Sequence, residues 1–252
     1  MTQSVIGAVN NARELFQIED FPGNLFSLLE SQRYIERFSL LLFREDISKL
    51  SGFIGYGENG LSLICINYKR PIGHQNFTLA HELGHWLLHN GQSISDNVTN
   101  YTWSKDTKEQ EANMFAGELL YPEKLFVQDY FEAVEKGFLQ ADKREELAVY
   151  IDKLCHKYCL SFDAVFRKIL YRSRQAAQYK QIKGQIEKAI GCRISEYFEK
   201  DFYIPNEALP EYQVLRDAYI ELEKRVNKLI ESGKISKATA EAIKYRNGIG
   251  VV

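Results

Sequence analysis

The chain contains the stretch Phe77-Thr-Leu-Ala-His81-Glu82-Leu-Gly84-His85-Trp-Leu-Leu-His89, which carries its strongest structural signal. Apolar residues fill most of its positions and Gly84 alone weakens a helix, so the pattern predicts a helix over 79–89. On a helix, residues four apart lie on one face, which places the imidazoles of His81 and His85 side by side with Glu82 next to them. The apolar residues at the other positions argue against the alternative that the two histidines simply lie on the exposed surface of an amphipathic helix.

This spacing suits Zn²⁺, which binds neutral imidazole nitrogens and keeps one position open for water when the protein supplies three ligands. The carboxylate of Glu82 is placed to take the proton from such a water molecule. The pattern therefore predicts Zn²⁺ as cofactor, with His81 and His85 as ligands and Glu82 as the catalytic base of a peptidase.

A third ligand is expected from the next helix, predicted over 108–120, which offers Glu109 and Glu111. Helical periodicity places Glu109 on the face expected to look into the core and Glu111 toward solvent. We predict Glu109 as the ligand. Asn113, one turn further on, is expected either to orient a histidine ligand through its second ring nitrogen or simply to pack between helices.

Two further histidines receive weaker interpretations. His89 lies one turn beyond His85, where it could be a fourth metal ligand or a group that faces the substrate. A fourth protein ligand, however, would fill the open position of a catalytic zinc site. Neither role is favoured for His89. His74 is expected in a loop before the helix.

The composition excludes several classes of protein. A formal net charge of −2 gives no global electrostatic reason to bind nucleic acid or a membrane surface. The apolar runs are shorter than the roughly 20 residues of a membrane span, and the first ten residues do not resemble a secretory signal, so we expect a cytoplasmic protein. The four cysteines are expected to be reduced and packed, although the spacing of Cys155, His156 and Cys159 leaves a second metal site as an alternative.

The remaining patterns predict an α+β fold. Residues 10–32 read as two short helices split at Pro22, residues 37–67 as short strands of a small antiparallel sheet, and residues 90–106 as a loop. Beyond Pro122 the chain reads as helical throughout, with helices predicted at 123–137, 143–159, 162–176, 177–198, 208–231 and 236–245. We predict a peptidase domain over 1–125, with its sheet packed on helices, and a helical domain over 126–252.

The stretch from Phe77 to His89 and the segment Glu109-Gln-Glu-Ala-Asn-Met-Phe-Ala-Gly-Glu-Leu-Leu-Tyr-Pro122 together resemble the ImmA/IrrE family of metallopeptidases, over about residues 35–175. The resemblance implies a zincin-like domain in which His81, His85 and Glu109 hold zinc and Glu82 is the base. It also implies a protein substrate, since members typically cleave a helix-turn-helix repressor to switch on genes of bacteria or their mobile elements. Tyr121 departs from the methionine that most members have before the proline, a position we interpret as structural.

Residues 143–175 resemble the helix-turn-helix-like part that follows the peptidase in this family. They carry basic residues, but interspersed acidic residues favour a solvated helix face over contact with DNA. The basic residues in question are Lys153, Lys157, Arg167, Lys168, Arg172 and Arg174.

Two rival functions stay open. One is a regulatory binding module with a vestigial metal site, against which the intact Glu82 counts. The other is a toxin-like or defence protease with broader targets.

Overall fold

The computed structural model describes residues 1–29, 38–56, 61–89, 94–96, 106–198, 213–247 and 249, and it is α+β, as predicted. The site-bearing part comprises α1 (Gln3–Phe16), α2 (Leu25–Leu29), β1 (Leu40–Glu45), β2 (Gly52–Tyr56), β3 (Ser62–Asn67), α4 (Ile72–Leu88), β4 (Ile94–Asp96) and α5 (Thr107–Leu120). It is followed by α6 (Glu123–Glu135), α7 (Arg144–Tyr158), α8 (Phe162–Arg172), a 3-10 turn (Ala176–Gln178), α9 (Tyr179–Ile190), α10 (Ile194–Phe198), α11 (Gln213–Glu231) and α12 (Lys237–Arg246).

The sheet is mixed, with strand order β1-β3-β2-β4, so the prediction of an antiparallel sheet is wrong for one pair. β2 and β3 form an antiparallel pair, but β1 lies parallel to β3 on its other edge, from the Leu40–Ser62 pair to the Glu45–Asn67 pair. Every residue of β3 is buried, which suits a central strand with neighbours on both edges. The strand β4, antiparallel to β2, lies inside the predicted loop, because three residues are too few to show a strand pattern.

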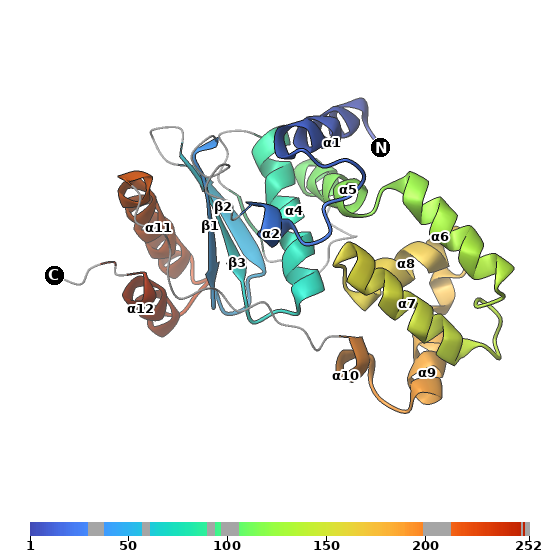
Figure 1. The fold of residues 1–252 in the computed structure, drawn as a ribbon. Helices are drawn as coiled ribbons and strands as arrows, with labels where there is room; N and C mark the ends of the chain where they lie inside the picture. Colours follow the sequence, from blue (N-terminus) through green and yellow to red (C-terminus); the bar gives the residue numbers. More distant parts are fainter. Residues whose placement is uncertain are drawn as a thin grey trace.

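Both faces of this sheet are covered. Ile54, Ile64 and Ile66 belong to the apolar core shared with α1, α4 and α5. The alternate side chains, among them Phe53 and Leu63, belong to a second core that includes Leu222, Val226 and Leu229 of α11 and Ala240 and Ile243 of α12. Figure 1 shows α11 and α12 on one side of the sheet and α4 on the other.

The last two helices therefore pack on the sheet. The predicted domain boundary between residues 125 and 126 stays a prediction. α11 and α12 follow this boundary in the sequence, but they contact strands that precede it.

A buried carboxylate holds α6 to its neighbours. The Asp129 carboxylate accepts hydrogen bonds from the hydroxyls of Tyr121 (3.0 Å) and Tyr158 (2.5 Å) and from the Lys157 ammonium (3.2 Å). The rings of Tyr121 and Tyr158 stack with centroids 4.0 Å apart. Tyr121 thus ties the end of α5 to α6 and α7, which supports its interpretation as a structural residue.

The helix α4 begins at Ile72, seven residues before the predicted start, directly after Pro71. A side chain at position 73 would lie 2.4 Å from the carbonyl carbon of Leu160, so Gly73 serves close packing against the chain before α8 rather than a turn. His74 accordingly lies in the first turn of α4, not in a loop. Its Nε2 atom shares a hydrogen bond of 2.9 Å with the Ser51 hydroxyl.

The long helix predicted over 177–198 is divided in the structure. It becomes α9 and α10, separated at Gly191, which adopts a left-handed conformation (φ 71°) and ends α9.

His74 makes stability depend on pH. Burial, with a smaller contribution from Arg70, lowers the pKa of His74 from 6.5 to about 4. Between these values the unfolded chain binds a proton at this residue that the folded chain does not, so stability is complete above about pH 6.5 and falls as the pH falls toward 4. When the pH is lowered from about 7.5 to about 4.5, the free energy of unfolding of the wild type should fall by about 2–3 kcal/mol more than that of His74→Gln. Urea unfolding in the presence of a chelator measures both values. Identical losses in the two proteins would contradict this assignment.

The packing of α11 on the sheet gives a second prediction. Leu222 is fully buried against the sheet, so Leu222→Ala should lower the free energy of unfolding by about 2–5 kcal/mol. Lys228→Ala, an exposed change on the same helix, should stay within about 0.5 kcal/mol. Denaturant titration of both variants measures the difference, and equal stabilities would show that α11 does not hold the sheet.

Candidate metal centre

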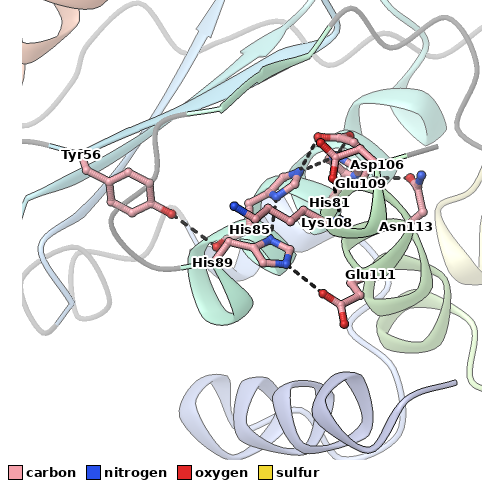
Figure 2. Close-up of polar contacts among 9 residues, drawn as sticks. All are labelled: Tyr56, His81, His85, His89, Asp106, Lys108, Glu109, Glu111 and Asn113. Carbon is pink, nitrogen blue, oxygen red and sulfur yellow. Dashed lines mark hydrogen bonds and ion pairs between the residues drawn. The ribbon is translucent and has the colours of Figure 1, made fainter. Parts of the chain in front are cut away.

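Three predicted site residues converge at one point between α4 and α5. His81 and His85 are fully buried one turn apart on α4, and Glu109 reaches them from the first turn of α5. The two Nε2 atoms lie 3.0 Å apart. One carboxylate oxygen of Glu109 lies 3.3 Å from Nε2 of His81, and the other lies 3.4 Å from Nε2 of His85. Figure 2 shows the three side chains pointing toward one another.

These distances fit a metal ion. Four ligand atoms placed about 2.05 Å from a zinc ion at the corners of a tetrahedron lie about 3.3 Å from one another. The two imidazole nitrogens lie 3.0 Å apart, and each has a different oxygen of the Glu109 carboxylate at 3.3 or 3.4 Å, so the separations are near that edge length. Two imidazoles and one carboxylate are also a donor set that zinc binds in hydrolytic enzymes and that leaves one corner open. The residues present therefore fit zinc.

The start and the packing of α5 place Glu109. Asp106 caps the helix by accepting a hydrogen bond of 2.9 Å from the backbone N–H of Lys108, and a carboxylate in the first turn is favoured by the helix dipole. The helix then crosses α4 at Gly84, where an added Cβ would lie 3.0 Å from the Phe115 ring and 3.1 Å from the Cα of Ala112. Because residue 84 is glycine, the two backbones approach closely enough for Glu109 of α5 to reach His81 and His85 of α4.

Asn113 lies where its interpretation as an orienting residue requires. Its side-chain oxygen is 2.9 Å from Nδ1 of His81. Because Nε2 of that ring faces the site, Nδ1 carries the proton and donates it to the amide oxygen. The contact fixes both the tautomer and the plane of His81.

His89 and Glu111 also belong to the site, although sequence reasoning assigned neither a role there. Nδ1 of His89 lies 2.9 Å from Nδ1 of His85, and Nε2 of His89 lies 3.2 Å from Glu111. Burial lowers the pKa of His89, and Glu111 opposes that shift. The expectation that Glu111 faces solvent is wrong, since its side chain is 22% exposed and turned toward α4. The signal for His89 was its spacing of four residues from His85.

Glu82 is fully buried on α4, and Tyr56 at the end of β2 lies close to it. The Tyr56 hydroxyl donates a hydrogen bond of 3.4 Å to the carbonyl oxygen of His85. Burial raises the pKa of Tyr56, and the charge of Glu82 adds to the increase. Among 15 tyrosines the sequence does not single out this one, because only the sheet brings it to α4.

The alternative metal site is not formed among the described residues. Cys155, His156 and Cys159 do not gather their ligand atoms, whereas His81, His85 and Glu109 lie within 4.8 Å of one another. The imidazole of His156 instead bonds to the Asp152 carbonyl oxygen at 2.9 Å.

Basic residues of the segment resembling a helix-turn-helix make contacts within the chain. Lys157 pairs with Asp129 at 3.2 Å, and Arg172 pairs with Glu123 at 3.3 Å. Lys168 donates to the Tyr121 carbonyl oxygen at 2.8 Å. These three basic side chains therefore contact groups of the same chain. None of the described helices combines the length and the apolarity that a membrane span requires.

An α+β scaffold that presents two histidines and a glutamate in this way is that of a metallopeptidase. The chain belongs to the peptidase family described as the IrrE N-terminal-like domain, whose model matches residues 35–170. It is also similar to the metallopeptidase ImmA of Bacillus subtilis (strain 168), with 25% identity over 129 residues, which is 51% of this chain and 69% of the relative. The resemblance to the ImmA/IrrE family is thereby confirmed, and both motif segments lie within the matched residues.

The contact at Gly84 can be tested with two matched substitutions. Gly84→Ala should force α4 and α5 apart by a few tenths of an ångström, lower stability by about 1–3 kcal/mol and weaken zinc binding about tenfold or more. Gly117→Ala is the control, because a Cβ there meets nothing within 4 Å, and it should stabilise the chain by about 0.5–1 kcal/mol with unchanged affinity. Chelator competition and urea unfolding measure both effects. Equal zinc affinities in the two variants would rule out this role for Gly84.

Proposed function

We propose that the protein is a zinc-dependent endopeptidase that cleaves a helix-turn-helix repressor and so derepresses genes of a stress response or a mobile element. The observation that carries the proposal is the convergence of His81, His85 and Glu109, whose ligand atoms lie within 4.8 Å of one another, with no fourth His, Cys, Asp or Glu gathered with them in the described part of the chain. His89, the nearest rival for a fourth ligand position, is turned to Nδ1 of His85 instead.

When bound, zinc supplies Lewis acidity that activates water and polarises a peptide carbonyl group. Glu82 lies next to the first histidine ligand and is fully buried. There it accepts the proton of the attacking water and then delivers that proton to the nitrogen of the leaving amine.

The substrate class follows from the family rather than from the geometry. A repressor acts on DNA inside the cell, so this substrate implies a cytoplasmic site of action. The contacts of Lys157, Lys168 and Arg172 within the chain give no support to direct DNA binding, and we propose that the protein recognises the repressor itself.

Glu82→Gln should separate metal binding from catalysis. The amide keeps the size of the side chain but cannot take a proton, so the variant should hold about one zinc per chain and lose at least about a hundredfold in cleavage rate. His81→Ala should lose the zinc as well. The measurements are metal content of the purified chains and, on a gel, cleavage of helix-turn-helix repressors from the same genome. The exposed change Glu135→Gln is the control and should leave both readings unchanged.

Each other outcome selects a different function. Undiminished cleavage by Glu82→Gln would sink the proposed mechanism. A wild type that binds the repressor without cutting it would be a regulatory binding module, and one that cuts many unrelated proteins would be a defence-type protease.

A further inference from the structure

We propose that His89 and Glu111 act as a pair of positioning residues that fix the tautomer and the ring plane of His85 for metal binding. The inference rests on the metal site of the proposed function. It adds a role for two residues that are neither metal ligands nor the catalytic base.

The geometry forces the direction of each hydrogen bond. Nε2 of His85 faces His81 and Glu109, so in the binding form that nitrogen presents its lone pair and Nδ1 carries the proton. Nδ1 of His85 must then donate to Nδ1 of His89 across 2.9 Å. The acceptor nitrogen has no proton, which leaves the proton of His89 on Nε2, where it donates to Glu111 across 3.2 Å. One carboxylate thus sets the tautomers of two rings.

The surroundings suit an orienting role. The His89 side chain is 6% exposed and that of Glu111 is 22% exposed, so water competes weakly for these hydrogen bonds. Figure 2 shows His89 between His85 and Glu111, with Glu109 approaching His85 from the other side. The helix α5 therefore contacts both nitrogens of this ligand: Glu109 directly at Nε2 and Glu111 through His89 at Nδ1.

The two histidine ligands are consequently held by different chemistry. His81 donates to the neutral amide of Asn113. His85 donates to an imidazole that is itself hydrogen-bonded to a carboxylate, which makes Nε2 of His85 the more basic ligand. Loss of such outer contacts costs about 10–100-fold in metal affinity, which sets the size of the expected effect.

The test uses the full chain with zinc or cobalt(II) alone as probe, at one fixed pH near neutrality. Glu111→Ala and His89→Ala should each weaken zinc binding about 10–100-fold in chelator competition and alter the visible absorption of the cobalt(II) form. Glu111→Gln should fall between wild type and Glu111→Ala, since its amide oxygen still accepts from His89. Because the two residues act in series, the double alanine variant should bind zinc about as weakly as His89→Ala alone.

Two surface changes serve as matched controls. Glu135→Gln removes an exposed carboxylate and His156→Gln an exposed imidazole, each from another helix, and both should bind zinc like the wild type. If the alanine variants lower only the thermal stability, with wild-type affinity and cobalt(II) spectrum, the pair merely packs and the proposal is overturned. Additive losses of affinity would also overturn it.

The result can be told apart from that for the proposed function. A wild type that binds zinc but cleaves nothing still reports on His89 and Glu111, whereas a wild type that binds neither metal refutes the metal site and this proposal together.

Discussion

The close approach of α4 and α5 at Gly84 is the constraint on which the site depends. His81 and His85 come together through the helix itself, but Glu109 belongs to another helix and must reach within 3.3–3.4 Å of both. With any side chain at position 84 the two backbones would have to separate, since a Cβ there already lies 3.0 Å from Phe115. Because Gly84 has no Cβ, Glu109 can approach the two histidines closely enough to form a three-ligand site.

Once the two helices are in contact, the first two turns of α5 surround the pair of histidines. Glu109 meets both Nε2 atoms, Asn113 holds Nδ1 of His81, and Glu111 reaches Nδ1 of His85 through His89. Another face of α5 is apolar and fully buried in the core. The same helix therefore contributes to the core and to the metal centre, which couples the geometry of the ligands to the packing of the domain.

The sheet supports α4 from one side and is itself covered from the other. Its strands carry nearly continuous apolar runs because α4 and α11 lie on opposite faces. Farther along the chain, Asp129 and its tyrosine partners fix α6 and α7 to the end of α5. The site thus lies on a helix packed between a doubly buried sheet and a helical layer, and this packing fixes the backbone that carries its ligands.

The sequence by itself determined the α+β class, most of the helices and the grouping of His81, His85 and Glu109. Periodicity within one helix is a local property, so it placed His81 beside His85 and put Glu109 rather than Glu111 on the ligand face. Tertiary structure alone decided the parallel pairing of β1 with β3, the short strand β4, the early start of α4, the place of α11 and α12, and the chain of contacts from His85 to Glu111. Each of these depends on which distant segment lies alongside, and that choice is made by packing and hydrogen bonding across the fold, which no pattern within one segment records.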